Sequence, residues 1–250
     1  MQIYAKSTIF AKQKHFEMVY RRLDESEFRD IEQRILFEDN HILILNKRPG
    51  EIVQGDKTGD EALSETLKAF IALRDDKPGQ VFIGVPHRLD RPVGGVVLFA
   101  KTSKALERLN DMLRKGEIHK TYWALCCAAP KEKEGELADR IIRNEKQNKS
   151  YVTKSAEGKE ARLKYRFIQQ TERYFLIEVE LLTGRHHQIR CQLSHMGCPI
   201  KGDLKYGAPR SNPDGSISLL ARHIQFIHPV KKTEVDVTAP VPESWKGVEG

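Results

Sequence analysis

The sequence predicts an α+β fold in which a mixed, largely antiparallel β-sheet is flanked by helices. Many short apolar runs have the length of strands, whereas few segments repeat apolar residues at helical spacing. One run, over residues 175–182, alternates apolar and mostly polar side chains, which is typical of a half-buried strand. The 250 residues, of which 39% are apolar, can bury a core in one large domain or two small ones.

Residues 1–33 are highly charged and are predicted to form an N-terminal extension, followed by the main domain over residues 34–250. In this domain, the run over residues 42–45 predicts a strand that enters a proline–glycine turn. Asp60 can cap the helix that follows, in which Leu63, Leu67 and Phe70 recur at helical spacing.

Apolar runs over residues 81–85 and 96–100 predict two strands in the middle of the domain. The polar stretch between them is predicted to be an exposed connection, and such connections often carry function. Ser103 can cap a second helix, which Gly116 can end. Further strands are predicted over residues 121–128, 163–168 and 175–182, and a last helix is predicted after Gly184.

The charge of the chain suggests a polyanionic partner. There are 42 basic and 35 acidic side chains, for a net charge of +7, although an inert basic surface is the alternative. Residues 140–166 hold nine Lys or Arg against three Glu, which predicts a loop or hairpin tip that follows a phosphate backbone through Lys146, Lys149 and Lys154. A solvated linker would have the same composition.

A soluble, cytoplasmic protein that does not bind a membrane is expected. No window has the roughly 18 unbroken apolar residues of a membrane helix, and lysines interrupt every candidate signal core near the N-terminus. The four cysteines lack the regular spacing of a secreted disulfide scaffold, so reduced thiols are expected.

The polar connection contains the first candidate site, PHRLDRPVGG, over residues 86–95. Asp90 lies between Arg88 and Arg91, and these guanidinium groups are expected to hold its carboxylate ionised and oriented. A carboxylate nucleophile needs both properties. Structural Asp–Arg pairs are commoner than catalytic ones, so the motif alone leaves both interpretations open.

The second candidate site is LLTGRHHQIRCQLSHMGCPIKGD, over residues 181–203. His186, Arg190 and Ser194 line up on one face of the predicted helix. Arg190 can hold a carboxylate through two hydrogen bonds or contact a phosphate. An ordinary polar surface stripe is the alternative.

Other chemistries compete in the same segment. Cys191, His195 and Cys198 are zinc-ligand types, but Cys198 follows the helix end and no CxxC pair accompanies it. Cys191 as a thiol nucleophile with His187 is a weaker alternative. Residues 197–202 have two glycines at the spacing of a phosphate-binding loop, yet the required Lys and Ser or Thr do not follow, so a nucleotide triphosphatase is not expected.

The third candidate site is HKTYWALCC, over residues 119–127. Tyr122 and Trp123 face opposite sides of a regular strand, so one can pack inward while the other stacks on a base. Core packing of both rings is the alternative.

Together these segments resemble the RluA-type pseudouridine synthases. HRLDRPVGG, KTYWAL and LLTGRHHQIRCQLSHMGCPIKGDLKYG carry the likeness, which runs from about residue 43 to residue 237. The resemblance implies the pseudouridine synthase catalytic fold and an isomerase that converts uridine to pseudouridine in ribosomal or transfer RNA.

The resemblance also implies roles for individual residues. Asp90 would be the nucleophile that attacks a uridine flipped out of RNA, and Arg190 would form the salt bridge that orients it. Tyr122 would lie against the uracil ring and help to remove the C5 proton, and Arg88 would fill the gap left in the RNA.

Further residues are expected to bind the substrate. His87 and Lys47 belong to this group. Leu89, Leu182 and Ile189, or their neighbours, are expected to wall the pocket against water, which would otherwise hydrolyse the opened ribose.

The chain departs from the family pattern at three places. Residues 92–94 replace acidic or hydroxyl residues after HRLDR, Arg48 separates Lys47 from the following proline, and His186 stands where Thr is frequent. The 33-residue extension is too short for the S4 RNA-binding module that many relatives carry, so none is expected.

No cofactor or metal is expected, because the isomerisation consumes no redox carrier, metal or nucleotide. Structured RNA is the expected partner of a monomer with no obligate protein partner. An RNA-binding or RNA-chaperone protein that has lost catalysis is one alternative. A metal-dependent hydrolase that uses His87, Asp90, His186 and His187 is another, and only this one would be inactivated by EDTA.

Overall fold

The structure, a computed structural model, describes residues 20–56, 58–77 and 79–248. Its strands are β1 (Ile35–Glu38), β2 (Ile42–Lys47), β3 (Gly94–Ala100), β4 (Ile118–Cys126), β5 (Glu134–Asn144), β6 (Lys149–Val152), β7 (Lys159–Gln170), β8 (Phe175–Leu181), β9 (Leu219–Ile227) and β10 (Glu234–Thr238). Its helices are α2 (Glu25–Arg34), α3 (Leu63–Arg74), α4 (Ser103–Lys115) and α5 (Gln188–His195), with a 3-10 turn, η2 (Leu204–Tyr206).

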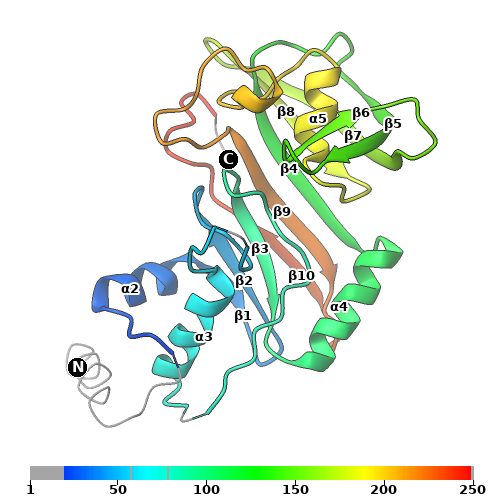
Figure 1. Cartoon of the computed structure of the whole chain (residues 1–250). Helices are drawn as coiled ribbons and strands as arrows, with labels where there is room; N and C mark the ends of the chain where they lie inside the picture. The colour runs from blue at the N-terminus through cyan, green and yellow to red at the C-terminus, as the bar shows by residue number, and fades with distance from the viewer. Residues whose placement is uncertain (1–19, 57, 78, 249–250) are drawn as a thin grey trace.

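The described strands form one sheet in the order β1-β2-β3-β9-β4-β8-β7-β5-β6, and β10 pairs with β9 (Figure 1). Every strand pair is antiparallel except β3–β9, which is parallel. The predicted α+β class, with a mixed and largely antiparallel sheet, is therefore confirmed. In Figure 1, α2 and α3 lie at the β1–β3 end of the sheet and α5 lies at the end formed by β5 to β8.

The parallel contact between β3 and β9 depends on a glycine of the first candidate site. Gly95 has a φ of +107°, a conformation that side chains with a Cβ rarely adopt. A Cβ at this position would lie 2.2 Å from the carbonyl oxygen of Ala221 on β9. The close approach fixes the end of the loop that carries Asp90 at the centre of the sheet.

Helices cover both faces of β2, so its apolar run is continuous rather than alternating. Leu43 and Leu45 belong to the same buried cluster as the apolar residues of α2 and α3. Ile42 and Ile44 face the other way and share a cluster with Leu109 of α4. The four apolar side chains of the strand are thus fully buried.

The N-terminal helix α2 joins this core. Asp24 and Glu27 form a reciprocal capping box at its start. Phe28 and Ile31 are buried, and the Phe28 ring lies 4.7 Å from that of Phe70 on α3. Residues 25–33 of the expected extension therefore contribute to the core, whereas residues 1–19 lie outside the described residues. The division of the chain at residue 33 otherwise stays a prediction.

Both predicted helix caps are wrong. α3 begins without a side-chain cap, because the carboxylate of Asp60 forms a 2.6 Å ion pair with Arg91 instead. α4 is capped by Thr102 rather than by Ser103, since the Thr102 hydroxyl accepts a hydrogen bond from the backbone N–H of Ala105. Gly116 ends α4 in the left-handed conformation, as predicted.

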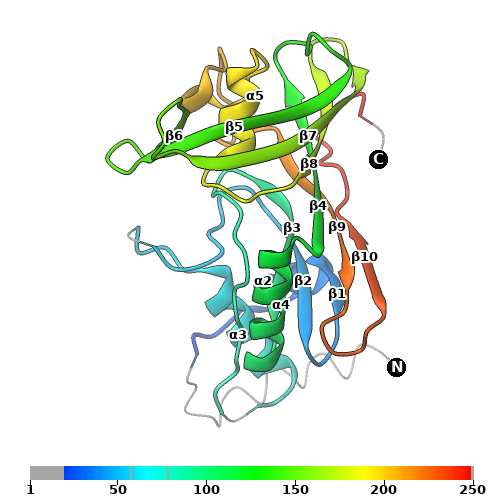
Figure 2. The same cartoon turned by 90° about the vertical axis from the view of Figure 1, so that its right-hand side faces the viewer.

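The strand predicted over residues 81–85 is also wrong. This segment forms a single bridge, between Gly84 and Ala100, and otherwise runs as a loop beside β3. The basic stretch, by contrast, forms a hairpin of β5 and β6 followed by β7, and Figure 2 shows the hairpin turn projecting beyond the body of the sheet. No helix within the described part of the chain combines the length and apolar character needed to cross a membrane.

Candidate active site

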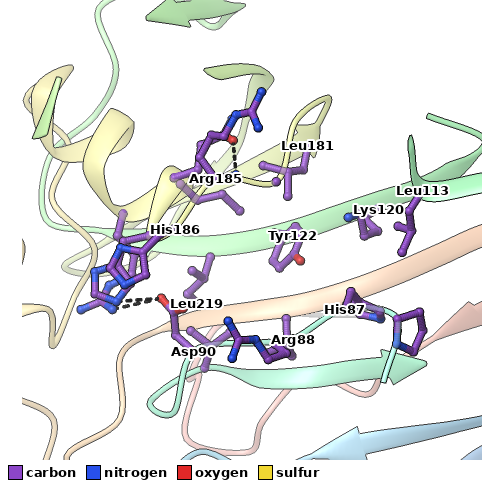
Figure 3. Close-up of a pocket in the computed structure, with 18 of the residues that line it drawn as sticks. His87, Arg88, Asp90, Leu113, Lys120, Tyr122, Leu181, Arg185, His186 and Leu219 are labelled. Atoms are coloured by element: carbon purple, nitrogen blue, oxygen red, sulfur yellow. Dashed lines mark hydrogen bonds and ion pairs between the residues drawn. The ribbon is translucent and has the colours of Figure 1, made fainter. Parts of the chain in front are cut away.

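A cavity of about 490 Å³ lies at the centre of the sheet, where the three candidate segments meet (Figure 3). The loop over residues 86–93 forms one side, β4 contributes Lys120 and Tyr122, and the start of α5 with the preceding loop forms the other side. The C-terminal end of α4, one residue of β5, Leu181 at the end of β8 and Leu219 at the start of β9 complete the lining. Segments about 100 residues apart in the chain thus share one pocket.

The carboxylate of Asp90 faces two basic side chains across this cavity. Its Oδ2 atom lies 3.1 Å from a terminal nitrogen of Arg190 and 3.5 Å from Nε2 of His187. The Arg190–Asp90 ion pair implied by the resemblance is therefore present. The expectation that Arg91 orients Asp90 is wrong, because Arg91 turns away to Asp60. Arg88 lines the pocket and is exposed, so it remains available to a ligand.

Arg190 is itself held by a carboxylate that the sequence analysis did not single out. Asp203, 1% exposed, accepts hydrogen bonds from Nε and the second terminal nitrogen of Arg190, at 2.6 and 2.8 Å. The guanidinium carbon also lies 5.0 Å from the ring centroid of Tyr206. This bidentate pair leaves one nitrogen of Arg190 for Asp90. Asp203 and Tyr206 belong to GDLKYG, a segment that carries part of the family resemblance, so this motif could have identified both residues as site candidates.

Lys47 holds the backbone of the Asp90 loop through hydrogen bonds. It is 1% exposed, and its ammonium donates hydrogen bonds to the carbonyls of Arg48, Arg91 and Val93, at 2.6–3.1 Å. Burial lowers the pKa of Lys47 to about 8. The expectation that Lys47 binds substrate is corrected: it lies outside the pocket lining and ties the loop backbone to β2.

Tyr122 forms part of the cavity floor, and Trp123 faces the opposite side of β4, as the strand period predicts. Burial, with a smaller effect from the charge of Asp90, raises the pKa of Tyr122 well above its usual value. Its hydroxyl is therefore protonated at neutral pH. The Trp123 indole N–H donates to Glu178, so this ring has a structural partner.

His87 and Lys120 lie on the same side of the cavity, near the end of α4 (Figure 3). Nε2 of His87 accepts a hydrogen bond from the backbone N–H of Leu98, at 3.1 Å, and burial lowers the pKa of His87 to about 3. Burial also lowers the pKa of Lys120. His87 is thus a neutral side chain of the pocket.

Apolar residues wall part of the cavity, close to the positions expected. Leu89 and Ile189 line it and are buried. Leu182 is 37% exposed and lies outside the lining, whereas its neighbour Leu181 lines the pocket. The side chains of β8 alternate, so one residue of shift changes which face is presented.

The rim of the cavity is strongly basic, and several of its cations were missed by sequence reasoning. The Lys and Arg side chains in the lining are Arg88, Arg114, Lys120, Arg143, Arg185 and Arg190, against one carboxylate, Asp90. Of these, only Arg88 and Arg190 were predicted from the sequence as site residues, although Lys120 and Arg185 also lie within the candidate segments.

The three lysines predicted to contact RNA backbone lie on the β5–β6 hairpin and beyond it, outside the pocket lining. Lys146 and Lys154 are exposed. Lys149 is half-buried, with its ammonium 5.2 Å from the ring centroid of Tyr151 and 5.1 Å from that of Tyr206. The hairpin therefore offers charge beside the cavity, with Lys149 packed on aromatic rings.

The β5–β6 hairpin is joined to the loop before α5 through His186. Its ring Nδ1 lies 2.9 Å from the Ser150 hydroxyl and its Nε2 lies 3.1 Å from the Asn148 side-chain oxygen. His186 also stacks on His187, with ring centroids 3.8 Å apart. A threonine, frequent in the family at this position, could not make the ring stack.

The metal alternatives receive no support from the arrangement. Over residues 20–56, 58–77 and 79–248, no three His, Cys, Asp or Glu side chains are grouped so that they could hold a metal ion. Cys191 and Cys198 are both buried but belong to different apolar clusters. Burial raises the pKa of the Cys191 thiol to about 11, which disfavours a thiolate nucleophile.

Comparison with known proteins gives consistent matches. The family model described as RNA pseudouridylate synthase matches residues 41–195. Ribosomal large subunit pseudouridine synthase D of Xylella fastidiosa is 31% identical over 229 residues, covering 86% of this chain and 68% of the relative. Ribosomal large subunit pseudouridine synthase C of Vibrio cholerae is 31% identical over 222 residues, with the same coverage.

Solved structures show the same fold. Human RNA Pseudouridylate Synthase Domain Containing 4 superposes with a TM-score of 0.73 at 22% sequence identity, covering 87% of this chain and 92% of the other. Human RNA Pseudouridylate Synthase Domain Containing 1 gives a TM-score of 0.64 at 21% identity, with 82% of each chain covered.

Proposed function

Since the chain belongs to the RluA-type family of RNA pseudouridine synthases, which are RNA uridine isomerases, we propose that it converts a uridine of ribosomal RNA to pseudouridine with Asp90 as nucleophile. The observation that carries the proposal is the Asp90 carboxylate, aimed into a basic cavity and paired with an arginine that Asp203 holds. Ribosomal RNA is chosen over transfer RNA because the names of the matched relatives specify the ribosomal large subunit.

The reaction begins when the target uridine leaves its stack and enters the cavity. Tyr122 provides a floor for the uracil ring, and Arg88, exposed at the rim, occupies the space left in the RNA. The basic rim neutralises the phosphates around the flipped nucleotide.

Asp90 then displaces uracil from C1′ of the ribose. A carboxylate oxygen forms a bond to C1′ while the N1–C1′ bond breaks, and the electron pair of that bond moves into the uracil ring. The detached uracil is an anion, and Lys120 on the cavity wall supplies a nearby positive charge. Leu89 and Ile189 exclude the water that would hydrolyse the ribosyl ester.

The ring rotates on Tyr122 and rejoins the sugar through C5. The C5–C1′ bond forms as the C1′–oxygen bond to Asp90 breaks, which returns the carboxylate. This carboxylate accepts the proton that C5 loses and passes it to solvent, and N1 takes a proton from solvent. Tyr122 does not act as the base here, because its raised pKa keeps the hydroxyl protonated.

The test is tritium release from RNA labelled with [5-³H]uridine, taken from a strain that lacks this gene and separated into ribosomal and transfer RNA. The wild type is expected to release tritium from the ribosomal fraction, and Asp90→Asn is expected to release none. Release from transfer RNA alone would change the substrate. No release from either fraction, with RNA binding intact, would favour a binding protein without catalysis.

We also propose that the protein acts in the cytoplasm and that it is a monomer. Gel filtration checks the oligomeric state.

A further inference from the structure

The contacts around His187 determine which of its ring nitrogens carries the proton. Nδ1 of His187 lies 3.0 Å from the Tyr206 hydroxyl. The same hydroxyl oxygen accepts a hydrogen bond from the backbone N–H of Ser150, at 2.8 Å. The Tyr206 proton must therefore be donated elsewhere, and Nδ1 of His187 is the acceptor found in the described part of the chain.

This arrangement leaves the His187 proton on Nε2, the nitrogen that faces Asp90. If Nδ1 carried the proton instead, the lone pair of Nε2 would face a carboxylate oxygen at 3.5 Å, and the Tyr206 hydroxyl would receive two donors with no acceptor for its own proton. An imidazolium would create the same conflict at Tyr206. Burial and the adjacent Arg190 lower the pKa of His187 to about 2, in agreement with a neutral ring.

We propose that His187 is a positioning residue that, as the neutral Nε2–H tautomer set by Tyr206, directs the nucleophile by donating to Oδ2 of Asp90. Both donors, Arg190 and His187, then act on Oδ2. Oδ1 is the oxygen left to form the bond to C1′, because within residues 20–56, 58–77 and 79–248 the hydrogen bond to this carboxylate is made to Oδ2 and none is made to Oδ1. The proposal rests on the proposed function for its kinetic consequences, whereas the tautomer is independent of it.

A neutral second donor suits this chemistry better than a second cation. Asp90 already pairs with one guanidinium, and a further positive charge would stabilise the carboxylate and weaken it as a nucleophile. The 3.5 Å separation is longer than a normal hydrogen bond, and such catalytic contacts commonly tighten when substrate binds.

The same contacts connect the nucleophile to the RNA-facing hairpin. Ser150 on β6 donates its backbone N–H to Tyr206 and bonds His186 through its hydroxyl, while His186 stacks on His187. The hairpin that carries Lys146 and Lys149 is thus two hydrogen bonds from the ring that positions Asp90.

The first test is the tautomer itself, measured by NMR on protein labelled with ¹⁵N-histidine. The His187 signals are assigned by their loss in His187→Gln. The pattern of couplings from ring protons to the two nitrogens is expected to show a neutral Nε2–H ring. Tyr206→Phe, which keeps the aromatic ring under Arg190, is expected to shift the ring toward a mixture of tautomers. An imidazolium or an Nδ1–H ring in the wild type would overturn the proposal.

The second test separates positioning from folding and from RNA binding. His187→Asn can replace Nδ1 but does not reach Asp90, so kcat is expected to fall about 100-fold with KM and RNA affinity unchanged. His187→Gln can place an N–H near the position of Nε2 and is expected to recover most of that loss. Tyr165→Phe, which removes the hydroxyl of another buried tyrosine, is the matched control for Tyr206→Phe and is expected to behave as wild type.

The outcomes separate the two proposals. Wild-type kcat in His187→Asn, or equal losses in His187→Asn and His187→Gln with a raised KM, would overturn the positioning role. If the wild type released no tritium from any RNA, the proposed function would fail, and the tautomer spectrum would still support or overturn the placement of the proton.

Discussion

Asp203→Asn should weaken both the fold and the active site, because Asp203 holds the arginine that orients the nucleophile. The carboxylate of Asp203 is 1% exposed and accepts two hydrogen bonds from Arg190, at 2.6 and 2.8 Å. An amide can accept one of these bonds, but its N–H₂ group would oppose an N–H of the guanidinium. Arg190 would then be left buried with Asp90 as its remaining carboxylate.

The magnitude follows from the burial of the pair. Removing one partner of a buried ion pair costs about 3–5 kcal/mol. Because the amide keeps one of the two hydrogen bonds, Asp203→Asn is expected to lower the free energy of unfolding by about 3 kcal/mol. For a domain of this size, about 2–4 °C of Tm is lost per kcal/mol, so a fall of about 6–12 °C is expected. The guanidinium would also pivot toward Asp90, and kcat should fall with RNA affinity unchanged.

Urea denaturation and thermal unfolding followed by circular dichroism give the stability, and tritium release gives kcat. Asp236→Asn is the matched control, because Asp236 forms a 2.9 Å pair with His223 at an exposed position and should change unfolding free energy by less than about 0.5 kcal/mol. A Tm for Asp203→Asn within about 2 °C of wild type would refute the reasoning that the buried pair stabilises the fold.

Three further predictions concern protonation, backbone geometry and charge. The pKa of His87 is about 3 in the folded protein, below its unfolded value, so the unfolded state binds the extra proton and stability should fall as pH drops from about 6.5 toward 3, by up to about 1.4 kcal/mol per pH unit. His87→Gln should lower this slope in urea titrations at several pH values, with the contribution of His187 remaining, and an unchanged slope would contradict the assignment. Gly95→Ala should abolish soluble, folded protein, because its Cβ would meet a β9 carbonyl oxygen at 2.2 Å; a normal Tm would show that β3 and β9 can separate. Lys146→Glu with Lys154→Glu should weaken RNA binding and lower the salt dependence of its affinity, whereas Lys104→Glu, near the far end of α4, should not; equal effects would point to overall charge instead.

The helical and strand periods were sufficient to predict the fold class, the helices α3, α4 and α5, and five of the ten described strands, whereas β1, β5, β6, β9 and β10 were not predicted. The alternation over residues 175–182 became β8, and the helix after Gly184 became α5, because each pattern specifies which side chains share a face. The wrong predictions came from interactions between distant residues, which the local sequence pattern does not specify. Asp60 did not cap α3, since Arg91 offered its carboxylate a charged partner, and residues 81–85 run beside β3 with a single bridge.

The sequence by itself determined which chemical groups are present and in what local order: Asp90 in its loop, Tyr122 on its strand, and Arg190 on its helix. The tertiary structure decided which of them meet. The parallel contact of β3 with β9 brings the Asp90 loop to the start of α5, and the turn before η2 returns Asp203 to Arg190. Spacing along a chain specifies neighbours within one element, whereas partners 100 residues apart are specified by strand order and packing.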